Sequence, residues 1–260
     1  MSIAVASPGV SIRPSIASSH PSGAYWARFL MQQSSGNPTD SIGGKTLAID
    51  ADLVTAGTAW SANSGWFSCI TDAAGGNGGA SIPNSQINSL DLRVHSILWS
   101  IRLLIPSSVT AQEAIMGFGG GSVSGVQMTK RPTGHELQLR INRGAAGSFG
   151  VVTGTALNDD AEHHVVLAVD GPSNIGYGWV DNVVQFTGQT LAAAGSGTGA
   201  PATEAFGFGH EGLGSGTTIA AQFRDVHLFQ WTGNLPARLA DGVAWLFKNK
   251  YDWMPAAIWP

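Results

Sequence analysis

The order of segments in the final third of the chain places the strongest constraint on its fold. Residues 163–170 (HHVVLAVD) alternate with the period of two of a strand, and both faces of that strand are largely apolar. A hairpin at 176–187, another strand at 223–230 and a helix at 235–250 follow. A strand with two apolar faces lies between layers of structure. We therefore predict a layered β structure against which the C-terminal helix packs.

Local signals support the hairpin and the helix. The hairpin turns at Asp181-Asn182, because these residue types tolerate the left-handed conformation that a two-residue primed turn requires. Pro236 suits the first turn of the helix. One face of that helix is apolar and is predicted to pack on the sheet; it carries Leu239, Val243, Leu246 and Phe247.

The rest of the chain also contains short strand patterns. The clearest is 97–105, and 135–142 alternates with one polar face. Residues 45–71 have scattered large apolar side chains broken by Gly and Ser, which favours several short strands. Trp99 and Trp179 lie within alternating strands and are predicted to be core or inter-sheet residues.

This order of elements resembles the C-terminal half of a laminin-G-like domain of the concanavalin A-like lectin/glucanase superfamily. The resemblance covers roughly residues 25–250, with AFGFGH at 205–210 in the place of a short family strand. It implies an all-β fold, a two-sheet antiparallel jelly-roll β-sandwich with one C-terminal helix. We expect an extended N-terminal arm at 1–23 and a sandwich at 24–260 that includes the helix and an apolar tail.

Composition excludes several classes of protein. The net charge of −4 and the pI near 5.9 give no basic face for nucleic acid. Cys69 is the single cysteine, so an internal disulfide is impossible, and no Cys/His spacing matches a zinc site. We therefore predict no cofactor and no metal. The sequence shows neither a secretion signal nor a long apolar span, so we expect synthesis in the cytoplasm and no membrane partner.

The N-terminal residues 1–23 are rich in Ser, Pro and Ala and have no periodic apolar face. Such an arm either floats or docks on a neighbouring subunit. The apolar tail YDWMPAAIWP after the helix, with Trp253 and Trp259, is expected to be anchored on the domain or on a partner.

The residues do not reveal an active site. A glucanase of the superfamily would carry two carboxylates in a motif similar to E-x-D-x-x-E, but none of the five Glu has an Asp two positions later. Ser, His and Asp are present without a G-x-S-x-G nucleophile motif. These observations predict a protein without enzymatic activity and without catalytic residues.

Two polar clusters near residue 160 have alternative interpretations. Asp159, Asp160 and Glu162 form the densest acidic group, and we interpret it as a solvated turn. His163 and His164 suggest a metal ligand or a general base. However, consecutive strand residues point to opposite faces, which favours a structural role for both.

Trp60 and Trp66 are the candidate binding residues. They are set among Ser, Asn and Gly, which favours exposed positions. Exposed Trp side chains stack on sugar rings, but aromatic residues are also enriched at protein interfaces, so glycan binding and partner binding both remain open.

Two functions fit these observations. The first is a non-enzymatic structural or adhesive subunit of a bacteriophage particle: a decoration, head-fibre or tail-associated protein. Its partners would be other virion subunits, including copies of itself in a homo-oligomer, and it would be located in the virion. The alternative is a carbohydrate-binding module that recognises a cell-surface glycan. The fold alone cannot distinguish them, because the same sandwich serves both.

Overall fold

The computed structural model describes residues 25–31, 35–42, 44–57, 59, 66–70, 78–86, 91–111, 113–118, 125–142, 147–190, 205–210 and 218–249. The predicted arm at 1–23, the apolar tail at 251–260 and Trp60 lie outside these described residues.

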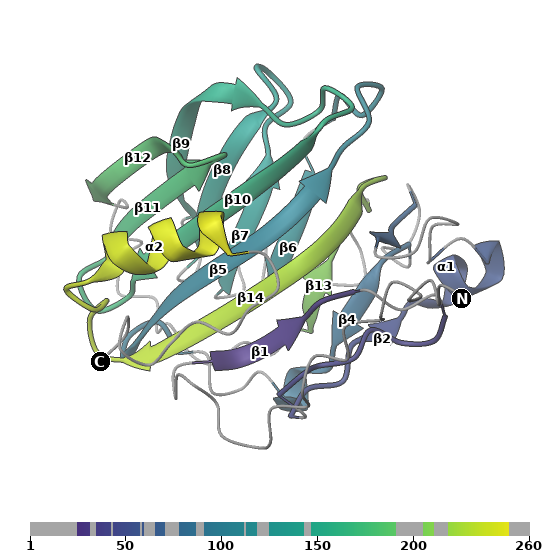
Figure 1. Cartoon of the computed structure of the whole chain (residues 1–260), viewed down its shortest axis with the longest axis horizontal. Coiled ribbons are helices and arrows are strands. Elements are labelled where there is room, and N and C mark those ends of the chain that lie inside the picture. Colours follow the sequence, from purple (N-terminus) through teal and green to yellow (C-terminus); the bar gives the residue numbers. More distant parts are fainter. Residues whose placement is uncertain are drawn as a thin grey trace, which may run out of the picture.

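Two antiparallel sheets form the molecule (Figure 1). Sheet A contains, in spatial order, β1 (Tyr25–Phe29), β14 (Gln222–Thr232), β5 (His95–Leu104), β10 (Glu162–Asp170), β11 (Ile175–Val180) and β12 (Val183–Thr190), and β3 (Phe67–Ser68) also pairs with β14. Sheet B has the order β2 (Ala48–Ile49), β4 (Ala80–Ile82), β13 (Phe206–Phe208), β6 (Glu113–Phe118), β7 (Gly125–Lys130), β8 (Glu136–Asn142) and β9 (Gly147–Ala156).

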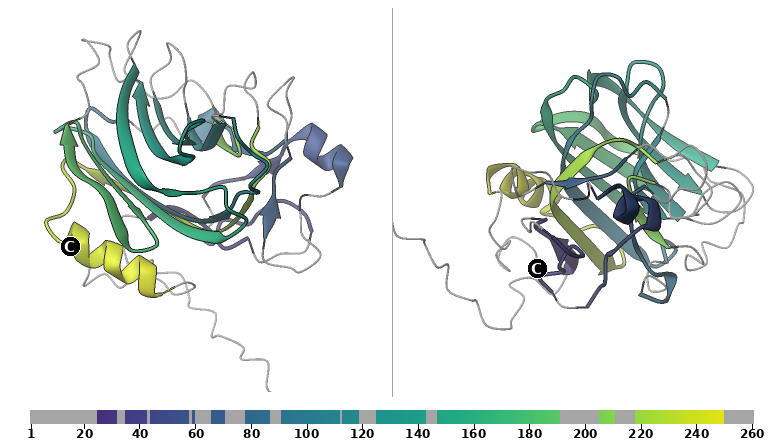
Figure 2. Two further views of the ribbon diagram at one scale, coloured as in Figure 1. Left: turned by 90° about the horizontal axis from the view of Figure 1, so that it is seen from above. Right: turned by 90° about the vertical axis from the view of Figure 1, so that its right-hand side faces the viewer.

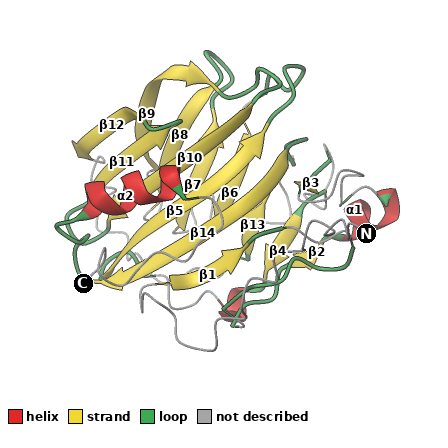
Figure 3. Cartoon of the chain, in the orientation of Figure 1, coloured by secondary structure: helices red, strands yellow, loops and turns green. Residues whose placement is uncertain are grey.

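Strands dominate the described residues, and the helices are short (Figure 3). They are α1 (Ala51–Ala56), one 3₁₀ turn at Asn84–Gln86, and α2 (Leu239–Lys248). The predicted all-β, two-sheet antiparallel sandwich with one C-terminal helix is therefore confirmed. None of the helices in the described ranges has the length and apolar character needed to cross a membrane.

The main core lies between the two sheets. Trp99 of β5 is fully buried there, and its ring contacts Phe206 and Phe118 at centroid distances of 5.1 and 6.2 Å. The alternate residues Ile97, Ile101 and Leu103 of the same strand belong to the same cluster. The period of two thus places one face of β5 against sheet B, as predicted for Trp99.

α2 lies against the outer face of sheet A (Figure 2). A second apolar cluster joins the helix to this face. The helix contributes Val243 and Leu246, which are almost fully buried. The sheet contributes Leu98, Val166, Ala168, Trp179 and Phe229. This cluster explains why the strand at 163–170 has two apolar faces, and it accounts for the burial of Trp179.

α2 begins at Leu239 rather than at residue 235, where the prediction had placed its start. The carboxylate of Asp170 accepts hydrogen bonds from Asn234 Nδ2 at 3.0 Å and from the backbone N–H of Leu235 at 3.3 Å. These bonds hold the chain in a non-helical conformation as it leaves β14. Pro236 therefore lies before the helix and not in its first turn.

The expectation of short strands throughout 45–71 is wrong for one segment. Residues Ala51–Ala56 form helix α1, in which Leu53 is fully buried and Val54 is 62% exposed. Gly57 ends the helix at φ 66°, and its N–H donates to Leu53 O at 3.1 Å. Two adjacent apolar residues do not distinguish a strand from a single helical turn, and the left-handed Gly57 favours the turn.

Candidate functional site

The outer face of sheet A has an apolar half under α2 and a polar half beyond it. On the polar half the register places Arg224 of β14 opposite Arg102 of β5, and Arg102 opposite His164 of β10. These three residues lie at alternate positions to the core residues of their strands. They form a row of nitrogen-rich side chains across three adjacent strands.

Glu162 bridges the two arginines of this row. Its Oε1 accepts a hydrogen bond from Arg102 Nη1 at 2.7 Å, and its Oε2 accepts one from Arg224 Nη2. Partial burial alone would raise the pKa of Glu162, but the hydrogen bonds from Arg224 and Arg102 outweigh it and lower this pKa to about 2. Glu162 is therefore an ionised bridge, which corrects its interpretation as part of a solvated turn.

Asp225 lies beside this network at an irregularity in β14. The register between β14 and β5 shifts between Arg224 and His227, and Asp225 has φ 50°. Its carboxylate is almost fully buried, 3.5 Å from Arg102 Nε. Burial raises the pKa of Asp225 to about 6 in spite of the neighbouring arginines.

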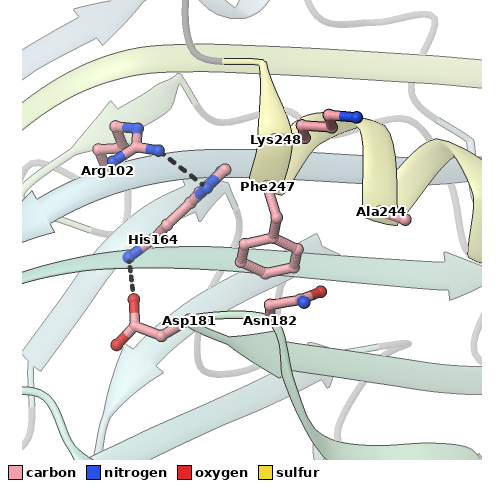
Figure 4. A pocket seen from close by; sticks show the side chains of 7 residues that line it. All are labelled: Arg102, His164, Asp181, Asn182, Ala244, Phe247 and Lys248. Atoms are coloured by element: carbon pink, nitrogen blue, oxygen red, sulfur yellow. Dashed lines mark hydrogen bonds between the residues drawn. The ribbon is translucent and has the colours of Figure 1, made fainter.

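A pocket of about 440 Å³ opens where this polar half meets the C-terminal end of α2. Its walls come from β5, β10, the β11–β12 turn and α2, and in the close view the side chains of Arg102 and Phe247 lie on either side of His164 (Figure 4). The lining residues are Arg102, His164, Asp181, Asn182, Ala244, Phe247 and Lys248. A pocket of this volume is within the range that small ligands occupy.

The β11–β12 turn places Asp181 and Asn182 at the rim of this pocket. Both have left-handed backbone conformations, with φ of 50° and 65°, as the sequence predicted for a two-residue primed turn. Asp181 Oδ1 accepts a hydrogen bond from the backbone N–H of His164 at 2.8 Å. Asp181 Oδ2 lies 2.6 Å from His163 Nδ1. The turn is thus tied to β10 through the Asp181 carboxylate and through the Asp181 backbone N–H, which donates to His164 O at 2.9 Å.

His163 has carboxylates at both ring nitrogens. Its Nε2 lies 3.0 Å from Asp159 Oδ1, and its Nδ1 faces Asp181. Burial disfavours the imidazolium, but the hydrogen bonds and charges of Asp181 and Asp159 outweigh it, so the pKa of His163 is raised above its ordinary value. His163 therefore carries positive charge over a wider pH range than a free histidine.

His164 points to the opposite side of β10 and into the pocket. Its Nε2 lies 2.7 Å from Ser100 Oγ, its Nδ1 lies 3.4 Å from Arg102 Nη2, and its ring centroid is 4.5 Å from that of Phe247. A guanidinium only donates, so Nδ1 accepts and the hydrogen of a neutral ring resides on Nε2. In that tautomer Nε2 donates to Ser100 and does not act as its base.

A Ser–His–Asp cluster lies near the edge of sheet B. His210 Nε2 is 2.9 Å from Asp50 Oδ2 and 3.3 Å from Ser81 Oγ, and Ser81 Oγ donates to Asp50 Oδ1 at 2.9 Å. In a catalytic triad the two ring nitrogens of the histidine face different partners. Here the same nitrogen faces both, so this cluster lacks the relay geometry of a triad.

The two histidines that suggested a metal ligand are separated as expected. His163 contacts Asp159 and Asp181, whereas the His164 ring contacts Ser100 and Phe247. Within the described ranges, no three His, Cys, Asp or Glu side chains converge as metal ligands would. The absence of a cofactor remains a prediction.

Of the two candidate binding residues, Trp66 lies at the border of the polar half. It immediately precedes β3, and the Arg224 guanidinium lies over its ring, 4.1 Å from the centroid. Through Arg224 and Glu162, Trp66 is connected to Arg102 in the pocket wall. Trp60 lies outside the described residues. Their role in binding stays a prediction.

Comparisons with known proteins identify the fold. No family model matches the chain, and no curated protein is similar to it in sequence. Among solved structures, a Trypanosoma rangeli sialidase in complex with sialic acid is 18% identical, with a TM-score of 0.53; the match covers 85% of this chain and 32% of the sialidase. The chain therefore spans about a third of that enzyme.

Two botulinum neurotoxin structures are also similar. One, of type C, concerns cell entry that depends on interaction with two ganglioside molecules; it is 10% identical, covers 86% of this chain and 51% of the toxin chain, and has a TM-score of 0.61. The other is the binding domain of neurotoxin DC in complex with rat synaptotagmin II, at 9% identity, the same two coverages and a TM-score of 0.59.

The prediction that the protein has no enzymatic activity is contradicted by the sialidase matches, because the same fold forms part of an enzyme. The missing E-x-D-x-x-E motif excludes one arrangement of glucanase carboxylates, and it does not exclude enzymes in general. At these identities the likeness shows the fold alone. The chain is similar to β-sandwich domains of the concanavalin A-like, jelly-roll type.

Proposed function

We propose that the protein is a glycan-binding β-sandwich domain and that its glycan site is the pocket between the β11–β12 turn and α2. The observation that carries this proposal is the convergence of a carboxylate, an amide, two cations and an aromatic ring on one pocket. Asp181 and Asn182 come from the two-residue β11–β12 turn, and Phe247 and Lys248 come from the C-terminal end of α2.

This set of side chains suits a sugar. Hydroxyl groups both donate and accept, so they pair with the acceptor oxygens of Asp181 and with the mixed donor and acceptor groups of Asn182. The apolar face of a pyranose ring packs on an aromatic ring such as that of Phe247. Arg102 and Lys248 add positive charge, which suits a sugar that carries a carboxylate.

The structural neighbours support the proposal. One of them was determined with sialic acid bound, and another concerns interaction with gangliosides. The sandwich in these proteins is similar to the present one in fold only, so the pocket described here supplies the chemical argument. Sialic-acid-bearing oligosaccharides are the first ligands to test.

Binding of the whole chain to an array of sialylated and neutral oligosaccharides tests the proposal. We expect binding to at least one glycan, and about a tenfold loss of affinity for Asp181→Asn and for Asn182→Gly. Asp181→Asn removes the charge and replaces one acceptor oxygen by a donor NH2 group, and Asn182→Gly removes the amide. Both substitutions keep residue types that accept the left-handed turn. Asp241→Asn, on the exposed side of α2, is the matched control and should bind as the wild type does.

Two outcomes would overturn the proposal. One is the absence of binding to any glycan by the folded protein. The other is binding that both turn variants retain at full strength, which would place the glycan site elsewhere on the molecule.

The more specific prediction of a bacteriophage-particle subunit rests on the sequence. Its grounds are the low content of charged residues, 12%, the Ser/Pro-rich segment at 1–23 and the laminin-G-like resemblance. An adhesive subunit with a glycan site would satisfy both predictions. Assembly into oligomers or onto particles, measured separately from glycan binding, is its test.

A further inference from the structure

We propose that His163 is a positioning residue for the glycan site: its imidazolium holds Asp181 in place, so that ligand binding weakens as the pH rises. This inference rests on the proposed function, since Asp181 is one of the groups assigned to the sugar. His163 itself is not among the pocket-lining residues and acts through Asp181.

The geometry around the ring requires two donors. Nδ1 lies 2.6 Å from Asp181 Oδ2, and Nε2 lies 3.0 Å from Asp159 Oδ1. Ionised carboxylates only accept hydrogen bonds, and a neutral imidazole has a single N–H. Only the imidazolium satisfies both contacts. A neutral ring would leave a nitrogen lone pair facing one of the two carboxylates.

His163 is buried, whereas its two carboxylate partners are partly exposed. The His163 side chain is 7% exposed, whereas those of Asp159 and Asp181 are 49% and 45% exposed. Asp159 precedes β10 and Asp181 is in the β11–β12 turn, so two separate segments supply the charges that His163 faces. His164, the neighbouring histidine, contacts Asp181 through its backbone N–H and its backbone carbonyl, neither of which titrates.

Loss of the proton should release Asp181 in part. The neutral ring donates to one carboxylate only, and the Asp181 carboxylate is then held mainly by the backbone N–H of His164, while the backbone bond from Asp181 N–H to His164 O keeps the turn itself in place. Because binding sites gain affinity when their polar groups are held in place before the ligand arrives, a looser Asp181 binds the ligand more weakly. Because the pKa of His163 is raised by Asp181 and Asp159, this loss occurs at a higher pH than for an ordinary histidine.

The first test does not involve a glycan. Proton NMR of the whole protein follows the titration of the His163 ring in the wild type and in Asp181→Asn. We expect the wild-type midpoint to lie above that of an ordinary histidine and to fall in Asp181→Asn. His95, at the start of β5, is the internal control, since its Nδ1 faces the Asp91 backbone carbonyl. An unchanged His163 midpoint in Asp181→Asn would overturn the inference.

The second test measures affinity for the best glycan from the array across the same pH range. We expect the wild-type affinity to fall about fivefold as His163 loses its proton, and His163→Gln to be weaker at low pH and independent of pH. His95→Gln should retain the wild-type profile. A His163→Gln variant that binds with the wild-type pH profile would contradict the inference, whereas absence of any glycan binding would contradict only the proposed function.

Discussion

Glu162 and Asp225 lie on the same face of sheet A and share Arg102 as a neighbour, yet their surroundings shift their pKa values in opposite directions. Two arginines lower the pKa of Glu162 from 4.5 to about 2 against the effect of burial. Burial raises the pKa of Asp225 from 3.8 to about 6. The two carboxyl groups should therefore stabilise the fold in different ranges of pH.

The sign of each contribution follows from its shift. The depressed pKa of Glu162 gives stability that is present above about pH 4.5 and is lost as the pH falls toward 2. The raised pKa of Asp225 gives stability that is present below about pH 4 and is lost as the pH rises through 6. Glu162 is partly exposed, so solvent screening reduces its contribution to about 1–2 kcal/mol.

Urea denaturation between pH 3 and 8 measures both effects. We expect Asp225→Asn to remove a decline of about 1–2 kcal/mol in the free energy of unfolding between pH 5 and 7, since Asn keeps the left-handed backbone and carries no charge. Glu162→Gln should instead lower stability at pH 7. If both variants follow the wild-type curve, the network contributes nothing to folding.

The residues of the site were only partly predictable from sequence. The Asp181-Asn182 turn could be predicted, because its conformation depends on two adjacent residues. The contact between Arg102 and His164 could not, because it depends on which strands are neighbours and on their register. The interpretation of Glu162 as a turn residue was wrong for the same reason, since both of its arginine partners come from strands distant in sequence.

At the scale of elements, close approach of strands restricts particular glycines. Gly117 of β6 has φ 144°, and a Cβ at this position would lie 2.2 Å from the Val126 carbonyl oxygen of β7. The obstructing atom belongs to the backbone of a paired strand and cannot rotate away. An L side chain at Gly117 would therefore be strained both by its φ and by this contact.

Gly117→Ala should lower the free energy of unfolding by at least about 2 kcal/mol. Gly44→Ala is the matched control, since a Cβ there would meet no atom within 4 Å, and we expect a change within about 0.5 kcal/mol. Thermal or urea denaturation measures both variants. Equal free energies of unfolding for the two variants would show that β6 and β7 can move apart to make room for the Cβ without loss of stability.

The elements themselves could be predicted where their periodicity was long. The strands at 97–105 and 163–170 correspond to β5 and β10, and their alternation is uninterrupted. The helix α1 was missed, because six residues hold less than two turns and give no periodic signal. The predicted start of α2 was too early, because Leu235 is held out of the helix by a hydrogen bond to Asp170. Asp170 belongs to β10, which is distant in sequence.

At the scale of the whole molecule, the sequence indicated the sandwich, whereas the prediction that the protein has no enzymatic activity is contradicted by the sialidase matches. A fold is set by the distribution of apolar side chains, which a pattern of residues reveals. Activity depends on a few polar groups that folding brings together from distant segments, so the absence of one linear motif is weak grounds for excluding it.

The last prediction concerns the segment 1–23, which lies outside the described residues. Pro8, Pro14 and Pro21 interrupt it, and its apolar side chains are scattered without a strand or helix period. Ordering each residue of such a segment costs roughly 1–2 kcal/mol of backbone entropy, so it should order only where a partner supplies compensating contacts. A neighbouring subunit could supply them by strand addition.

Deletion of residues 2–21 should therefore leave the melting temperature of the monomer within about 2 °C of the full chain, because the core cluster of the described residues is formed by side chains from residue 26 onward. Oligomerisation, measured by sedimentation, should weaken in the same variant, while glycan binding at the Asp181 pocket should stay unchanged. Replacement of residues 2–21 by a Gly/Ser segment of equal length is the control for chain length. If the deletion unfolds the monomer, residues 2–21 are part of the domain, and the assembly role loses its support.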